Sequence, residues 1–129
     1  MYEPISDATE AIARRFFDTA FEVHRQLGPG LLESVYETCL CYEMDRIGLP
    51  YQRQLVVPIR YRELIIDDGL RLDLLIAEEV VIELKAIEAL LPIHEAQLLT
   101  YLRLTNKRLG FLVNFNVPLL KQGIKRIVL

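Results

Sequence analysis

Two kinds of hydrophobic periodicity divide the chain into helices and strands. Apolar residues recur every three or four positions in three segments, which predicts helices over residues 8–27, 31–47 and 92–105. In the other segments apolar residues alternate with polar ones or run together, which predicts strands over residues 55–61, 64–66, 70–76, 80–86, 109–117 and 124–128. The order of elements indicates one α/β or α+β domain over residues 1–129, with a sheet flanked by helices.

Residues that end or interrupt regular structure lie between these segments. Asp7 and Glu10 form a capping-box pattern at the start of the first helix, and Gly28-Pro29-Gly30 ends it with a tight link to the second. Pro58 predicts that its strand is an edge strand or carries a bulge. Asp67-Asp68-Gly69 predicts a turn between two short strands.

Charged side chains stand at apolar positions in the strands 70–76 and 80–86. Glu83 and Lys85 point to the same face of their strand because side chains alternate. A three-residue connection at Ala77-Glu78-Glu79 would set Asp73 beside Glu83, whereas a two-residue turn would put Asp73 on the opposite face. Two adjacent carboxylates repel each other, so the first arrangement favours a divalent cation with oxygen ligands, Mg²⁺ above all.

The same residues have an ordinary structural interpretation. A Glu-x-Lys pattern is common on half-exposed strands, where alternate side chains face water and opposite charges are harmless. Taken alone, Asp73, Glu83 and Lys85 therefore do not establish a site.

Composition narrows the classes of function. No apolar run is long enough to span a bilayer and the first residues lack an export signal, so we expect a cytoplasmic protein. The net charge of −3 counts against a protein that coats nucleic acid, but it leaves open a nuclease with an acidic metal site. Cys39 and Cys41 are expected to be core residues, and two histidines make a zinc site improbable.

Three motifs in order resemble one known family. Residues 30–36 read G-x-x-E-x-x-Y, Asp73 precedes Glu83-Leu84-Lys85, and residues 93–101 read IHEAQLLTY. Over residues 10 to 128 this combination resembles the GxxExxY family of the PD-(D/E)XK nuclease superfamily, with Leu72 in place of the proline of the superfamily name. The resemblance implies a restriction-endonuclease-like core with a mixed β-sheet, and a metal-dependent phosphodiesterase or nuclease that hydrolyses phosphodiester bonds.

The resemblance also implies roles for individual residues. Asp73 and Glu83 would bind Mg²⁺ or Mn²⁺ together with the backbone carbonyl of Leu84, and Lys85 would orient the attacking water or offset charge on the phosphate. Glu33 would add a carboxylate, although an acid in the first turn of a helix also complements the helix dipole. Gln97, on a helix face otherwise suited to packing on the sheet, would position water or Lys85.

Three neighbours of these motifs are expected to have lesser roles. Tyr36 is expected in the core, with its hydroxyl holding a carboxylate. His94 and Glu95 are expected to be capping or surface residues.

Three functions follow from this reading. The first is a nuclease acting on nucleic acid, with DNA favoured over RNA on superfamily grounds alone. The second is a non-catalytic module that retains the nuclease fold and binds nucleic acid or a protein. The third is a small structural homodimer with an incidental ion site.

Overall fold

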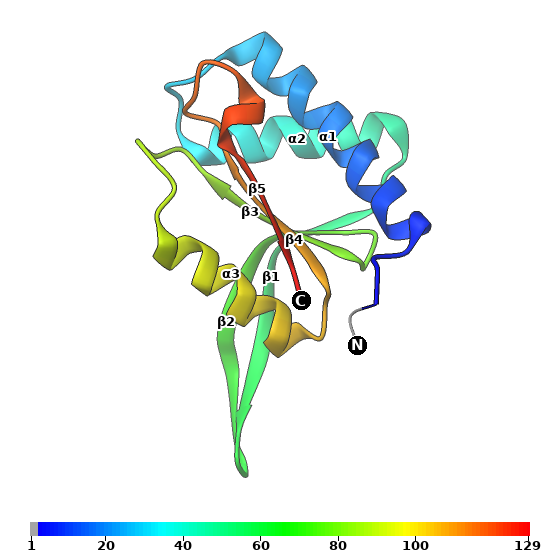
Figure 1. The fold of residues 1–129 in the computed structure, drawn as a ribbon, viewed down its shortest axis with the longest axis vertical. Helices are drawn as coiled ribbons and strands as arrows, with labels where there is room; N and C mark the ends of the chain where they lie inside the picture. Colours follow the sequence, from blue (N-terminus) through cyan, green and yellow to red (C-terminus); the bar gives the residue numbers. More distant parts are fainter. Residues whose placement is uncertain (1–2) are drawn as a thin grey trace.

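The computed structural model describes residues 3–129 and contains three helices, five strands and a short 3₁₀ helix. The elements in chain order are α1 (Asp7–Leu27), α2 (Glu33–Ile47), β1 (Tyr51–Tyr61), β2 (Leu64–Ile76), β3 (Val80–Lys85), α3 (Pro92–Thr105), β4 (Leu109–Asn114), η1 (Leu120–Gly123) and β5 (Ile124–Val128). This is the α+β organisation predicted from the sequence (Figure 1).

The five strands form one mixed sheet in the order β1-β2-β3-β4-β5. β3 and β4 are parallel and are connected through α3, whereas the other neighbouring pairs are antiparallel. All six residues of β4 are buried, as expected for a strand covered on both faces. The strand ends at Asn114, three residues earlier than the apolar run predicts.

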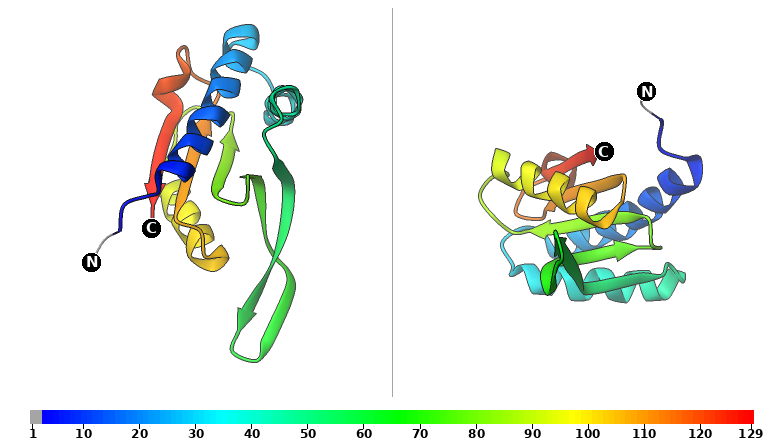
Figure 2. Two further views of the ribbon diagram at one scale, coloured as in Figure 1. Left: turned by 90° about the vertical axis from the view of Figure 1, so that its right-hand side faces the viewer. Right: turned by 90° about the horizontal axis from the view of Figure 1, so that it is seen from below.

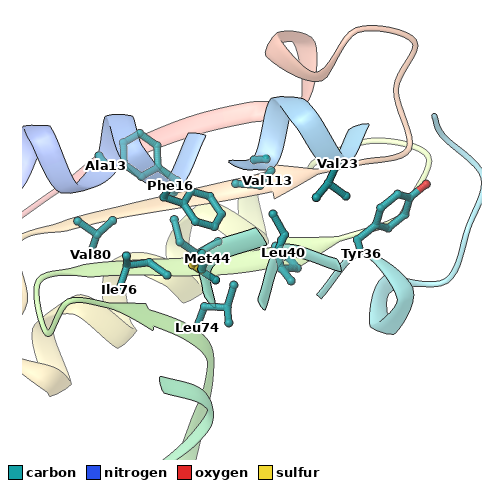
Figure 3. Packing of buried hydrophobic residues seen from close by; sticks show 14 of the residues in the cluster. Ala13, Phe16, Val23, Tyr36, Leu40, Met44, Leu74, Ile76, Val80 and Val113 are labelled. Atoms are coloured by element: carbon teal, nitrogen blue, oxygen red, sulfur yellow. The ribbon is translucent and has the colours of Figure 1, made fainter. Parts of the chain in front are cut away.

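Helices cover both faces of the sheet, and each face has its own apolar cluster. On one face α1 and α2 supply residues such as Phe16, Tyr36 and Leu40, which pack on β2, β3 and β4 (Figure 3). On the other face α3 lies across the sheet (Figure 2), and its residues Leu98 and Leu102 pack on the strands. We call these the α1–α2 cluster and the α3 cluster.

β2 is one continuous strand, which corrects the prediction of a turn at Asp67-Asp68-Gly69. Between the pairs Val57–Leu70 and Ile59–Ile66 the register shifts, so the extra residues form a bulge opposite Pro58. The bulge needs Gly69, because a Cβ at this position would lie 2.5 Å from Cγ1 of Ile59. The prediction from Pro58 is confirmed, since β1 is an edge strand.

At Asp73 the alternation of side chains along β2 shifts, so that the even-numbered residues change from one face of the sheet to the other. Leu70 and Leu72 belong to the α3 cluster, but Leu74 and Ile76 belong to the α1–α2 cluster. On the side of Leu64, before Asp73, β1 and β2 extend away from the other strands as a two-stranded arm (Figure 1).

Three smaller predictions have mixed outcomes. The N-cap of α1 is Ser6, whose Oγ accepts a hydrogen bond from the Thr9 N–H at 3.1 Å, and Asp7 is the first helical residue instead. Cys39 and Cys41 are free thiols, half-buried and buried respectively. Within residues 3–129 no helix is long and apolar enough to cross a membrane.

Candidate active site

The β2–β3 connection sets the two predicted carboxylates opposite each other. Ile76 pairs with Val80, and Ala77 to Glu79 form the turn between them, closed by a hydrogen bond of 2.9 Å from the Glu79 N–H to the Ile76 carbonyl. Continued along the strands, this register places Asp73 opposite Glu83. The register predicted from a three-residue connection is therefore confirmed.

The strands separate at this position, and side-chain carboxylates replace backbone carbonyls as the acceptors of hydrogen bonds between them. The ladder of paired residues ends at Leu74 and Ile82. Beyond it, the Asp73 N–H donates to Oε2 of Glu83 at 2.9 Å, and the Leu84 N–H donates to Oδ2 of Asp73 at 2.8 Å. The two side chains thus fill the fork between β2 and β3.

Negative charge is concentrated in this fork. Glu83 is only 8% exposed, and burial together with the charge of Asp73 raises its pKa to about 8. Burial also raises the pKa of Asp73, and the nearby Glu37 contributes in the same direction. Hydrogen bonds from the backbone oppose both shifts without cancelling them. A cation between the two carboxylates would remove this repulsion.

Lys85 is half-buried at the end of β3, two residues beyond Glu83. Its positive charge counteracts the raised pKa of Asp73, Glu83 and Glu33. Among residues 3–129 no carboxylate lies within 4.0 Å of its ammonium group. The strand end is fixed by a hydrogen bond of 2.9 Å from the Phe115 N–H to the Lys85 carbonyl, so the lysine is positioned beside the carboxylates without being paired to one.

Glu33 of α2 interacts electrostatically with residues of the fork. It is the first residue of that helix and is exposed. Partial desolvation raises its pKa, Asp73 and Glu37 raise it further, and Lys85 lowers it. The structure therefore brings Glu33 into the electrostatic neighbourhood of Asp73 and Lys85.

Gln97 lies on α3 but not on its packing face, which corrects the sequence prediction. The buried residues of α3 are Leu98 and Leu102, whereas Gln97 is exposed. Tyr101 follows one turn later, and the Gln97 side chain counteracts the rise in the pKa of Tyr101. Burial raises the pKa of Tyr101, as do the charges of Glu83 and Asp73. Tyr101 thus interacts electrostatically with the two carboxylates of the fork, and Gln97 interacts with Tyr101.

Sequence reasoning did not single out two residues that interact electrostatically with the fork, Tyr101 and the buried carboxylate Glu37. Glu37 is 7% exposed and accepts hydrogen bonds from Arg53 at 2.8 and 3.1 Å. The available signals were helical spacings, since Tyr101 follows Gln97, and Glu37 follows Glu33, by four residues.

Two further residues have structural roles. Tyr36 is fully buried as predicted, but its hydroxyl donates to the Gly28 carbonyl at 2.6 Å and accepts from the Leu31 N–H at 3.2 Å, so it does not hold a carboxylate. His94 caps α3 as predicted, with Nδ1 accepting from the Leu91 N–H at 2.9 Å.

The donor set at the fork fits a hard divalent cation. Within residues 3–129 no group of three or more His, Cys, Asp and Glu side chains is arranged as a metal cage. Mg²⁺ does not require one, because it is commonly bound through one or two carboxylates, with water and substrate oxygens completing its coordination. Asp73 and Glu83 supply those two carboxylates in a setting where their charges are otherwise poorly compensated.

Comparison with known proteins gives one family. The sequence model of the PD-(D/E)XK nuclease superfamily matches residues 10–127. No significant match was found among curated proteins or among solved structures.

Proposed function

Because the chain belongs to the PD-(D/E)XK nuclease superfamily, we propose that it is a metal-dependent nuclease whose active site is the fork between β2 and β3. The observation that carries the proposal is the pairing of Asp73 with Glu83, with Lys85 beside them on β3. The α+β fold with a mixed sheet agrees with a restriction-endonuclease-like protein. The residues of the G-x-x-E-x-x-Y motif, Gly30, Glu33 and Tyr36, further suggest the GxxExxY branch of the superfamily.

Asp73 and Glu83 would hold Mg²⁺ or Mn²⁺, with the backbone carbonyl of Leu84 as a further oxygen ligand. When bound, the ion would polarise the phosphoryl oxygen of the scissile phosphodiester and activate the attacking water. Each carboxylate is already oriented by a backbone N–H of the neighbouring strand. This preorganisation lowers the cost of bringing two like charges to one cation.

Lys85 would act on water and phosphate. An ammonium group near the carboxylates but not paired with one is free to orient the attacking water and to offset the charge that develops on the phosphate in the transition state. Glu33 would supply an additional carboxylate at the rim, and Gln97 with Tyr101 would fix water on the α3 side. We propose nucleic acid as the substrate, with DNA as the favoured polymer, and a single domain that acts alone or as a homodimer.

The proposal is tested by incubating the purified chain with labelled single-stranded, duplex and branched DNA and RNA in Mg²⁺ or Mn²⁺. We expect cleavage of at least one substrate, complete inhibition by a chelator, and no cleavage by an Asp73→Asn preparation purified in parallel. The parallel variant excludes a contaminating nuclease, which the substitution would not affect. Metal binding without cleavage of any substrate would contradict the enzyme and favour the binding module.

A further inference from the structure

Gln54 lies on β1 directly across from Asp73. The β1–β2 register pairs Arg53 with Leu74 and Leu55 with Leu72, so Gln54 and Asp73 are the residues between these pairs. Gln54 has a φ of 50°, in the left-handed region that residues with a β-carbon rarely adopt. β1 continues through this residue, so no chain reversal requires the conformation. Backbone outliers of this kind persist where surrounding contacts hold them, and they are common at functional sites.

The left-handed backbone at Gln54 changes the direction in which its side chain points. Successive residues of a strand normally point to opposite faces. Arg53 and Gln54 nevertheless both bind the carboxylate of Glu37, Arg53 at Oε2 and Gln54 at Oε1, the latter at 2.6 Å. The unusual φ thus directs the Gln54 amide to the same side as the Arg53 side chain, toward Glu37 of α2.

The amide of Gln54 has carboxylates on two sides. Its Nε2 donates to Glu37, and the strand register places Asp73 opposite Gln54, where the amide counteracts the rise that burial causes in the pKa of Asp73. An amide nitrogen carries two N–H groups, so one can serve each carboxylate. Glu37 determines which end of the amide faces Asp73, because only the nitrogen end can donate to Glu37. Arg53 in turn holds Glu37 through two hydrogen bonds to one oxygen.

We infer that Gln54 is a positioning residue, whose amide holds the Asp73 carboxylate in the orientation in which Asp73 and Glu83 take up one divalent cation. The inference rests on the proposed function of the fork. Groups that hydrogen-bond a metal-binding carboxylate fix its direction, and losing one commonly weakens metal binding by about 10- to 100-fold. The position is well suited to this task, because β1 and β3 flank β2 on either side. Asp73 then lies between the Leu84 N–H of β3, which donates to its Oδ2, and Gln54, which faces it across the β1–β2 register.

The test distinguishes the effect of the Gln54 amide from the effect of the left-handed backbone at this residue. Gln54→Gly removes the amide and also relieves the left-handed strain, whereas Gln54→Met keeps the length of the side chain and removes its hydrogen bonds. Arg62→Gly is the matched control, since Arg62 has a φ of 54° at the tip of the arm and its replacement relieves strain of the same kind away from the fork. Mn²⁺ affinity is measured by calorimetric titration at one pH, and folding is checked by thermal denaturation.

We expect both Gln54 variants to remain folded and to bind Mn²⁺ about 10- to 100-fold more weakly than the natural chain, and Arg62→Gly to bind it unchanged. An unchanged Mn²⁺ affinity in either folded Gln54 variant would overturn the inference and leave the proposed metal site intact. If Gln54→Gly does not fold, Gln54→Met decides the question by the same criterion. A natural chain that does not bind Mn²⁺ would instead overturn the proposed function and this inference together.

Discussion

The carboxylate of Glu83 accepts the backbone N–H of Asp73 at 2.9 Å, although the two side chains carry the same charge. The reciprocal bond from the Leu84 N–H to Asp73 locks this arrangement. Backbone hydrogen bonds therefore hold together two groups whose charges oppose each other. Either a proton on one carboxylate or a bound cation can remove the repulsion between Asp73 and Glu83. The first two predictions concern these two cases.

Without metal, the protein should lose stability as the pH rises. The pKa of Glu83 is about 8 in the folded chain against 4.5 as its ordinary value, so the folded state binds the proton more tightly than the unfolded state. The resulting stabilisation is complete below pH 4.5 and is lost as the pH rises through about 8. The pKa values of Asp73 and Glu33 are also raised, so these residues contribute in the same direction. Urea denaturation at a series of pH values in chelator measures the trend.

Glu83→Gln should flatten most of that dependence and make the metal-free protein more stable at pH 8, since each unit of pKa shift corresponds to about 1.4 kcal/mol. The amide oxygen of glutamine can still accept the Asp73 N–H. Glu79→Gln, at the exposed turn of the same hairpin, is the control and should keep the natural pH dependence. Stability that is constant or rises from pH 5 to pH 8 in the natural chain would contradict the raised pKa of Glu83.

Divalent metal should reverse the effect of Asp73 on stability. In chelator, Asp73→Asn should be at least as stable as the natural chain, because it removes a repelling charge while keeping an oxygen for the Leu84 N–H. With Mn²⁺ at a hundred times its Kd, the natural chain should gain about 2.7 kcal/mol and the variant should gain little. Thermal denaturation with and without Mn²⁺ measures both. A large loss of stability for Asp73→Asn in chelator would identify Asp73 as a structural ion-pair partner.

Lys85→Ala should separate catalysis from metal binding. The lysine is assigned to water and phosphate, so its loss should lower the cleavage rate by about 10²–10³-fold while the Mn²⁺ affinity changes little. Cleavage assays and calorimetric titration of the same preparation provide the two measurements. Lys121→Ala, which replaces an exposed lysine of η1, is the control and should retain the cleavage rate of the natural chain. A parallel loss of Mn²⁺ affinity in Lys85→Ala would place the lysine in the metal site instead.

Tyr36→Phe should destabilise the link between α1 and α2. The hydroxyl joins the Gly28 carbonyl to the Leu31 N–H, whereas the ring stacks on Phe115 with centroids 4.5 Å apart and would remain in place. Losing the hydroxyl should therefore cost about 1–3 kcal/mol in free energy of unfolding, measured by urea denaturation. Tyr42→Phe is the control because Tyr42 is 64% exposed on α2, and it should leave the stability unchanged.

The hairpin that forms the fork could be predicted because its geometry is local. The number of residues between Ile76 and Val80 determines the register, and the register determines which carboxylates meet. The side change of β2 at Asp73 could not be predicted in this way. It depends on which helix packs over each half of the strand, and Leu72 and Leu74 are the same residue type on opposite faces.

The face of α3 that packs on the sheet could not be predicted from its sequence. Leu98 and Leu102 are buried, but Ile93, Leu99 and Leu104 are exposed, so apolar residues surround the helix and no single stripe marks the packing face. The sequence pattern consequently assigned Gln97 to the wrong face. The bonds among Glu37, Arg53 and Gln54 were hidden for another reason, since they join α2 to β1 and depend on a left-handed φ at a residue type that rarely adopts one.

The side change of β2 has a consequence for how the protein unfolds. Asp73 stands where the even-numbered residues of β2 change from the α3 cluster to the α1–α2 cluster, and Glu83 faces it from β3. An ion held by both residues would therefore join two units across their boundary. One unit is the arm with α3, and the other is the rest of the sheet with α1 and α2. In its absence we expect the arm and α3 to open at lower free energy than the rest of the sheet, so their amide hydrogens should exchange faster than those of β3 and β4. With the ion bound, the two units should exchange and unfold as one.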